Sequence, residues 1–422
     1  MSSSRYRRLR TLAFGLGAAA FVLAFFHRVA PGAIAVDIRE AFSTNATTLG
    51  FVAAFYFYPY ALMQLPSGVL ADSIGPRRLF TAGSLVAGVG SILFGLAPSV
   101  AWLLAGRALV GLGVAVAFIS VLKLIASWFQ EREFATWVGI LQLIGNLGAV
   151  LAVFPLAWVA QQMSWRGVFV ATGVLSLLVG IAIWVGLRDT PEDAGLPPPE
   201  GERRAAAPAQ AHWLQGLRLV AGNSQTWAAF AVNFGMVGSY MAFAGIWAVP
   251  YLMEAHGLSR DEATLRLTVM ILGFAFCAPA VGTISDRIRR RRPLLRGMAL
   301  VSFLSWMPFV LGWRLDGTSL TLVLWIIGLG VSCAVLSWAV GKEVNPPELA
   351  GTATSLVNTA GFLGGALLQP LVGWVLDQSV HLPPAEAYRR ALVLLAVTSF
   401  IGVVGAFRLR ETHCRNVWPE RR

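Results

Sequence analysis

Long apolar stretches recur along the chain, each close to the length that a helix needs to cross a lipid bilayer. About 30 Å of hydrocarbon requires about 20 residues in a helix. None of the stretches alternates apolar and polar residues with period two, so helical spans are predicted rather than the strands of a membrane barrel. Twelve spans are predicted, at about residues 11–36, 47–71, 79–98, 100–126, 135–160, 166–188, 224–253, 263–285, 294–313, 318–341, 351–376 and 386–408.

The composition supports the same interpretation. Of the 422 residues, 56% are hydrophobic and 13% are charged, and the mean hydropathy is +0.67, whereas a soluble chain has roughly 45–50% apolar and 25% charged residues. An integral membrane protein surrounded by the lipid bilayer is therefore predicted. The three cysteines, Cys277, Cys333 and Cys414, have no metal-ligand spacing and form no disulfide framework. No cofactor and no metal site are expected.

A polar segment divides the chain into two halves. Residues 188–210, RDTPEDAGLPPPEGERRAAAPAQ, combine prolines, glycines and mixed charges and cannot bury a core. We therefore expect an N-terminal six-helix bundle (1–188), a cytoplasmic linker (189–223), a C-terminal six-helix bundle (224–410) and a cytoplasmic tail (411–422).

The basic residues predict the orientation in the membrane. The net charge of +12 comes from arginines in short loops, which argues against nucleic acid as a partner. Of the 33 basic residues, 23 fall in the segments on the side of the N-terminus, seven fall in the opposite loops, and Arg28, Arg107 and Lys123 lie within spans. By the positive-inside rule, both termini are expected in the cytoplasm, with the protein a multi-pass component of the cell inner (plasma) membrane.

One loop sequence occurs twice. GVLADSIGPRR (68–78) follows the second predicted span, and GTISDRIRRRR (282–292) follows the eighth, so the two copies share Gly, Asp, Ile and two Arg at an offset of 214. The glycines Gly68 and Gly282 are expected to let two helices approach closely. The Asp and Arg groups lie at span ends, where they can pair with each other and with helix termini.

These motifs resemble those of the major facilitator superfamily of secondary transporters, with its G-x-x-x-D-R-x-G-R-R loop. Ser73 stands where that pattern has Arg, and GRALVGLG (106–113) resembles the superfamily's R-x-x-x-G-x-G pattern. The resemblance implies an all-α protein of twelve transmembrane helices in two pseudo-symmetric six-helix bundles, which alternately open a central site to either side. It implies function as a monomer and gating roles for the loop residues Gly68, Asp72, Gly75, Arg77, Arg78 and Asp286.

The stretch AFFHRVAPG (24–32) places Arg28 inside the first span. An ionisable residue there costs a few kcal/mol and needs an explanation. Facing a cavity, Arg28 could bind a carboxylate, phosphate or sulfonate through its planar guanidinium group. The alternative is a structural arginine, bonded to backbone carbonyls that Pro31 and Gly32 release or to Asp37.

Two neighbouring positions are candidates for coupling. His27 points about 100° away from Arg28 on the helix, and it is either a proton carrier or a neutral packing histidine. Arg107, which the family pattern associates with cavity organisation or proton coupling, has a structural alternative as well. No Asp or Glu lies deep within a span, so a cavity that prefers anions is expected.

The His-Arg pair also resembles the Asp-Arg pair of the anion:cation symporter branch, alongside sugar-phosphate permease-like relatives. His27 replaces the Asp, and Val114 stands where that branch often has a Glu.

Other candidates for substrate contacts are polar or aromatic residues within spans. Tyr56, Tyr60 and Gln64 follow each other at i, i+4 and i+8, and a helix would place them on one face. Packing or anchoring at the membrane interface is the alternative for the aromatic members. The remaining candidates are Gln142, Asn146, Tyr240, Trp247 and Asn358, with Asn233 and Gln369 nearby.

The sequence therefore predicts a secondary active transporter that moves a small, anionic organic solute by alternating access, with proton coupling as an option, and not an enzyme. A drug or metabolite exporter and a riboflavin- or copper-type importer of the same superfamily are alternatives. A sensor or an enzyme on a transporter fold would need an output domain or clustered catalytic residues, and the five histidines are scattered.

Overall fold

The computed structural model describes residues 2–64, 66–197 and 213–418, and these residues contain helices and no strands. Part of the predicted linker (198–212) and the end of the predicted tail (419–422) lie outside the described residues. The helices of the first half are α1 (Ser2–Ala33), α2 (Ala35–Phe42), α3 (Ala46–Ala54), α4 (Phe57–Met63), α5 (Pro66–Ile74), α6 (Pro76–Gly95), α7 (Val100–Val114), α8 (Ala117–Trp128), α9 (Glu131–Leu151), α10 (Phe154–Met163), α11 (Trp165–Gly186) and the 3-10 turn η1 (Glu192–Ala194).

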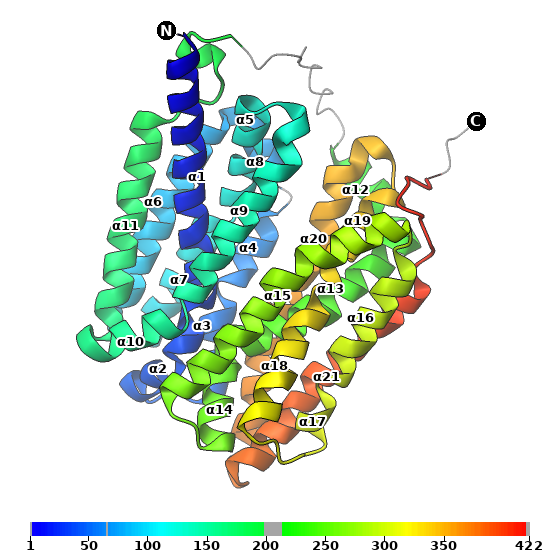
Figure 1. The fold of residues 1–422 in the computed structure, drawn as a ribbon. Coiled ribbons are helices and arrows are strands. Elements are labelled where there is room, and N and C mark those ends of the chain that lie inside the picture. Colours follow the sequence, from blue (N-terminus) through cyan, green and yellow to red (C-terminus); the bar gives the residue numbers. More distant parts are fainter. Residues whose placement is uncertain (1, 65, 198–212, 419–422) are drawn as a thin grey trace. The chain divides into compact units, whose positions relative to one another are not determined.

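The second half continues the same architecture (Figure 1). Its elements are α12 (Trp213–Ala221), α13 (Ser224–Ala242), the π-helical segment η2 (Phe243–Trp247), α14 (Ala248–His256), α15 (Arg260–Ile288), α16 (Arg292–Leu304), α17 (Met307–Val310), α18 (Gly317–Val331), α19 (Ala334–Glu343), the 3-10 turn η3 (Pro347–Leu349), α20 (Ala350–Gln378) and α21 (Pro384–Arg408).

Twelve helical segments of the described residues are long and apolar enough to cross a membrane. This confirms the predicted all-α fold with twelve spans. Several spans consist of two helices in sequence, such as α7 with α8 and α18 with α19. The helix of the second span is described up to Met63, a turn follows at Gln64, and the helix α5 begins at Pro66.

Contacts between backbone positions divide the chain into two compact units. Unit 1 comprises Met1–Ala30 and Tyr58–Ala209, and unit 2 comprises Pro31–Phe57 and Gln210–Arg422. The first two spans thus contribute to both units. The chain changes unit at Pro31 and after Phe57, and both points lie next to an irregularity in a span, a proline in α1 and the turn between α3 and α4.

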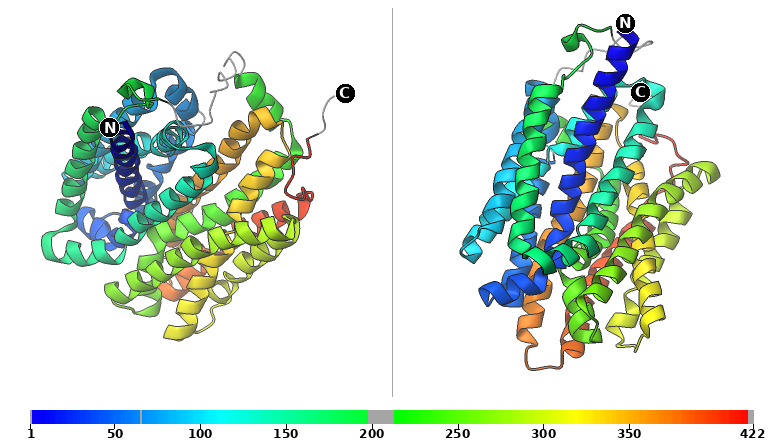
Figure 2. Two further views of the ribbon diagram at one scale, coloured as in Figure 1. Left: turned by 45° about the horizontal axis from the view of Figure 1, so that its top comes forward. Right: turned by 60° about the vertical axis from the view of Figure 1, so that its left-hand side comes forward.

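In unit 1, α6 packs along α7 and α11, as Figures 1 and 2 show. Glycines permit this contact, because a Cβ atom added at Gly90 would lie 2.8 Å from the Gly106 carbonyl oxygen. The glycine-rich fifth span serves the same purpose. A Cβ atom at Gly145 would lie 2.7 Å from the ring of Phe21 in α1. Small residues allow helices to pack closely where lipid supplies no hydrophobic driving force.

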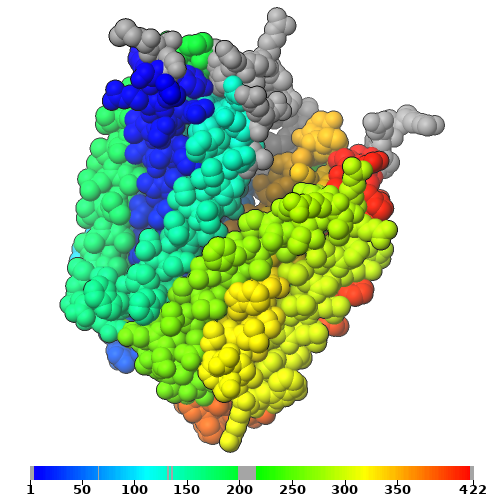
Figure 3. Space-filling view, viewed as in Figure 1, coloured from blue at the N-terminus to red at the C-terminus, as the bar shows by residue number. Residues whose placement is uncertain are grey.

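In unit 2, α13 packs against α20 and α21. A Cβ atom added at Gly238 would lie 2.8 Å from the Cα atom of Gly364, so these two helices also meet at glycines. On another face of the unit, α15 (lime) runs beside α18 (yellow) in Figure 3. The exposed side chains of these two helices include Leu265, Phe276, Ile284, Leu322 and Trp325. Such an apolar face is suited to lipid.

Candidate functional site

Arg28 in α1 is half-buried in unit 1 and lies between two aromatic rings. Its guanidinium carbon is 4.6 Å from the ring centre of Phe25 and 5.3 Å from that of Tyr60 in α4. Its Nη2 atom donates a hydrogen bond to the Tyr60 hydroxyl group at 3.2 Å. The rings fix the plane of the guanidinium group by cation–π contact. Asp37, which the sequence offered as an alternative partner, pairs with Arg260 at 3.0 Å.

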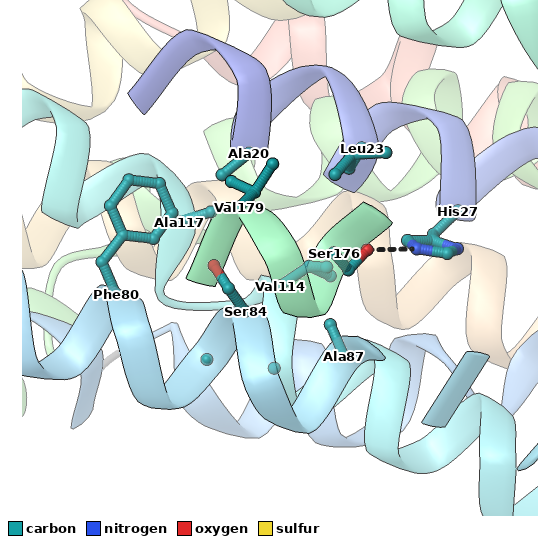
Figure 4. A pocket seen from close by; sticks show the side chains of 12 residues that line it. Ala20, Leu23, His27, Phe80, Ser84, Ala87, Val114, Ala117, Ser176 and Val179 are labelled. Atoms are coloured by element: carbon teal, nitrogen blue, oxygen red, sulfur yellow. Dashed lines mark hydrogen bonds between the residues drawn. The ribbon is translucent and has the colours of Figure 1, made fainter. Parts of the chain in front are cut away.

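His27 points into the interior of unit 1, away from the contacts of Arg28. It is fully buried, and its Nε2 atom lies 3.3 Å from the hydroxyl oxygen of Ser176 in α11, as Figure 4 shows. A cavity of about 10 Å³ adjoins it, lined by α1, α6, α7, α8 and α11. Such a cavity has room for about one water molecule and not for an organic solute. The packing observed for His27 is therefore that of an interior residue.

Arg107 in α7 bonds to the backbone of α1 at the proline. Pro31 has no N–H group, so it cannot donate to the carbonyl of His27 four residues earlier. The Nη1 atom of the fully buried Arg107 donates to this carbonyl oxygen at 2.7 Å. Arg107 thus supplies the hydrogen bond that the proline removes. A bond of this kind to a backbone carbonyl was the structural alternative for Arg28 in the sequence analysis. In the structure, Arg107 makes it.

The other candidates in unit 1 lie on α4, in the turn after it, and on α9. Tyr60 is buried, whereas Gln64, Gln142 and Asn146 are each half-buried. The amide of Asn146 donates to the Gln142 carbonyl one turn earlier at 2.9 Å. Among the described residues, the side-chain oxygen of Gln142 is buried and has no hydrogen-bond partner. A buried acceptor of this kind is a suitable contact for a hydroxyl or amide donor.

The remaining candidates belong to unit 2. Tyr56 lies in the turn between α3 and α4. The prediction that it shares one continuous helix face with Tyr60 and Gln64 is therefore wrong. Trp247 is buried, and its indole N–H donates to the Gln369 backbone carbonyl at 3.0 Å. Tyr240 is half-buried beside Phe274. Asn358 is half-buried in α20.

The first copy of the repeated loop forms contacts within unit 1. Asp72 forms an ion pair with Lys123 of α8. The expectation that Gly68 and Gly282 allow a close helix approach is wrong in this structure. A Cβ atom added at Gly68 would meet nothing within 4 Å, and one at Gly282 would meet only Val335 at 3.9 Å.

Gly75 and Arg77 have clear stereochemical roles at the start of α6. Gly75 has φ of 85°, a conformation that favours glycine, and an added Cβ atom would lie 2.6 Å from the Asp189 carboxylate. The backbone N–H of Arg77 donates to this carboxylate at 2.5 Å, and its guanidinium group bonds to the Trp184 carbonyl. Arg78 is exposed.

The second copy of the loop is held by buried charges in unit 2. The guanidinium group of Arg291 contacts Asp286 at 2.6 Å and Glu343 at 2.9 Å. The Glu411 carboxylate, which follows α21, accepts the backbone N–H groups of Arg291 at 2.8 Å and Arg292 at 3.0 Å. It therefore caps the N-terminus of α16, where a negative charge is stabilised by the helix dipole.

Asp189 and Glu411 are residues that the sequence reasoning missed. They lie in a second repeat, LRDT (187–190) after the sixth span and LRET (409–412) after the twelfth. In each unit the carboxylate binds the N-terminus of the helix that follows the repeated loop. A comparison of the ends of the two halves would have found the pair.

Replacing Glu411 by glutamine is expected to lower stability by about 1 kcal/mol, the contribution typical of a capping group. Burial alone would raise the pKa of Glu411, but the backbone N–H donors of Arg291, His413, Arg292 and Thr412 lower the pKa below its usual 4.5. The stabilisation should therefore be complete above about pH 4.5 and should disappear as the pH falls through the lowered pKa. The apparent melting temperatures of both proteins measured against pH would show this. Glu348→Gln, at an exposed site, is the control. Equal melting temperatures of Glu411→Gln and wild type at neutral pH would contradict the capping role.

A second set of polar contacts lies at the end of unit 2 that carries α2, here named the α2 end. The Asp377 carboxylate at the C-terminus of α20 accepts hydrogen bonds from the backbone N–H groups of Ala46 at 2.8 Å and Thr47 at 2.9 Å. It also accepts the Thr47 hydroxyl at 2.5 Å. Asp377 therefore caps the N-terminus of α3, although it is about 330 residues away in the sequence.

Ion pairs join other elements at the α2 end. Arg39 of α2 contacts Glu254 of α14 at 2.5 Å, and the hydroxyl group of Tyr388 in α21 donates to the same carboxylate at 3.2 Å. With the pair of Asp37 and Arg260, these contacts attach the ends of the first two spans to the seventh, eighth, eleventh and twelfth. The sequence showed only that these carboxylates lie at span ends.

The chain is similar to known proteins over most of its length. The family model described as Major Facilitator Superfamily matches residues 16–369. A probable sulfoacetate transporter of Cupriavidus necator is 26% identical over 390 residues, which are 88% of this chain and 88% of the relative. A D-galactonate transporter of Escherichia coli is 23% identical over 411 residues, 91% of this chain and 93% of the relative.

Among solved structures, the crystal structure of a D-xylose–proton symporter matches with a TM-score of 0.75 at 15% identity. The match covers 96% of this chain and 99% of that protein. At this level of identity the likeness concerns the fold alone. It confirms the predicted architecture.

Proposed function

The chain belongs to the Major Facilitator Superfamily, and from this premise we propose that it carries a small organic anion across the membrane by alternating access. The observation that carries the proposal is Arg28. It is a half-buried arginine inside a span, oriented by Tyr60 and Phe25. A guanidinium group held in this way can donate paired, coplanar hydrogen bonds to two oxygen atoms of a carboxylate, sulfonate or phosphate.

The names of the relatives support an anionic substrate. The transporters from Cupriavidus necator and Escherichia coli are named for sulfoacetate and D-galactonate, respectively. Both molecules carry oxyanion groups that an arginine recognises. We propose that this chain takes an organic acid of the same kind, with hydroxyl or amide groups recognised by Gln142 and Asn146 of α9.

The orientation and gating expectations form part of this proposal. Both termini lie in the cytoplasm, and the protein is a monomer in the plasma membrane. During the transport cycle, Asp72 and Asp286 leave the partners that they have within their own units and pair with other groups. Arg77 and Arg78, in the same loop as Asp72, take part in this gating. Gly75 gives this loop its conformation.

Uptake into proteoliposomes tests the proposed function. Radiolabelled sulfoacetate, D-galactonate and glycerol 3-phosphate would be offered to purified protein, with D-xylose as a neutral control. We expect saturable uptake and counterflow of at least one anion and none of the sugar. Repeating the uptake with an imposed pH gradient and with an imposed voltage tests proton coupling. Transport of xylose without transport of any anion would overturn the proposal.

A further inference from the structure

Three helical spans with an internal proline or π-helical turn meet within unit 2. α1 contains Pro31, followed by Gly32, and the seventh span contains the π-helical segment η2 with Pro250 shortly after it. α20 contains Pro370, which follows Gln369. Proline removes a backbone hydrogen bond from a helix, and π-helical turns occur frequently at functional sites. Their meeting point is therefore a place where the spans can bend.

Gln369 bonds to the seventh span just before η2 and at the last residue of η2. Its side-chain Nε2 atom donates to the Met241 carbonyl at 3.2 Å, and its backbone carbonyl accepts the indole N–H of Trp247 at 3.0 Å. Gln369 is fully buried. These two bonds fix the register between α20 and the π-helical segment.

Glycines bring the first and second spans against the same point. A Cβ atom added at Gly32 would lie 3.0 Å from the carbonyl oxygens of Ala244 and Gly245 in η2. One added at Gly50 in α3 would lie 2.7 Å from the Cα atom of Pro370. At Gly245 it would lie 2.7 Å from the Nε2 atom of Gln369. At Gly32 and Gly50 the backbones therefore touch without intervening side chains, and a shift of Gln369 would disturb the contacts at Gly50 and Gly245.

The bonding of Gln369 is incomplete. Among the described residues, its side-chain oxygen Oε1 is buried and has no hydrogen-bond partner. A buried acceptor without a partner costs free energy, which favours any arrangement in which it gains one. The side chain of Gln369 thus holds the seventh span through its Nε2 donor alone.

We propose that Gln369 is a positioning residue of the transport cycle: it holds η2 and α20 in the register on which α1 and α3 pack, and α1 and α3 separate from η2 and α20 when the α2 end opens. The inference rests on the alternating access of the proposed function. Asp377, eight residues further along α20, caps α3 at the same end and acts with it. Gln369 itself needs no contact with the substrate.

Alkylation of an introduced cysteine tests the inference without any substrate. Ala53 is buried in α3, one turn from Gly50, and Ala53→Cys would report on separation of α3 from α20. Cys277 and Cys414 would be replaced by serine, and the fully buried Cys333 would stay as an internal reporter of unfolding. The purified protein in lipid nanodiscs would react with a polar maleimide, and mass spectrometry would give the rate at each cysteine.

We expect Gln369→Leu to accelerate labelling of the cysteine at position 53 by roughly fivefold, the effect of losing the one side-chain hydrogen bond of Gln369 to Met241. Labelling of Cys333 should stay slow. Gln378→Leu, at the exposed end of the same helix, is the matched control. Gln369→Asn, whose amide is too short to reach Met241, should give the same acceleration and serves if Gln369→Leu does not fold.

Unchanged labelling at position 53 in Gln369→Leu or Gln369→Asn, with Cys333 protected, would overturn the inference. Acceleration at both cysteines would also overturn it, because it would show a general loss of packing. Neither outcome depends on the transported molecule. The labelling experiment and the anion uptake assay can therefore fail independently of each other.

Discussion

Replacing Arg28 by alanine is expected to reduce anion uptake by roughly 10- to 150-fold, the effect of losing a hydrogen bond to a charged group. The loss should appear mainly as weaker binding, measured as a higher KM in uptake and a higher Kd by calorimetry. The physical reason is that the guanidinium group lies between Phe25 and Tyr60 and is held by the Tyr60 hydroxyl. Its geometry is set before the anion arrives, so little ordering is needed on binding.

Arg28→Lys separates charge from geometry. Lysine keeps the positive charge but loses the planar pair of donors, so it should recover only part of the affinity. Arg314→Ala, at an exposed loop position, is the control for loss of one positive charge. Uptake by Arg28→Ala with an unchanged KM and an unchanged maximal rate would exclude Arg28 as the anion contact.

Replacing Arg107 by methionine is expected to lower stability by roughly 1–3 kcal/mol, because it leaves the His27 carbonyl buried without its donor. Methionine is chosen because it keeps much of the side-chain volume and avoids a large cavity. The apparent melting temperature in detergent would measure the loss, and transport should fall as α1 loses this bond next to Pro31.

A second substitution makes this prediction specific. Alanine at position 31 restores the backbone N–H group that can bond to the His27 carbonyl within the helix. The double variant Pro31→Ala with Arg107→Met should therefore lose clearly less stability than the sum of the two single variants. If the two effects simply add, Arg107 stabilises the protein in some way other than by replacing the hydrogen bond missing at Pro31.

Hydrophobic span length was the most informative signal in the sequence. It is a local property, so the number of spans and the helical class could be predicted without knowledge of any contact. The turns within the second predicted span, at Tyr56 and at Gln64, have no counterpart in its continuous apolar run. The i, i+4 spacing predicted that Tyr56 and Tyr60 share one helix face, because nothing in the apolar run indicates the turn between α3 and α4.

Span length and periodicity could not identify contacts between residues that lie far apart in the sequence. Arg107 and the His27 carbonyl are 80 residues apart, and Asp377 and Thr47 are 330 apart. The sequence did show that Pro31 must leave a carbonyl without a donor, but several arginines could have supplied one. It assigned Gly68 to close packing because glycine often has this role, whereas the surroundings of Gly68 are open.

The residues after α21 have a practical meaning for protein engineering. Beyond the bonds of Glu411, the Thr412 hydroxyl donates to Glu343 at 2.6 Å, and the backbone N–H of Val417 donates to the Glu343 carbonyl at 2.7 Å. An expression vector that stops after Arg408 would remove these bonds and leave the start of α16 without its cap. Affinity tags and fluorescent fusions should therefore follow a spacer placed after Trp418, and deletion series aimed at crystals should keep everything up to that residue.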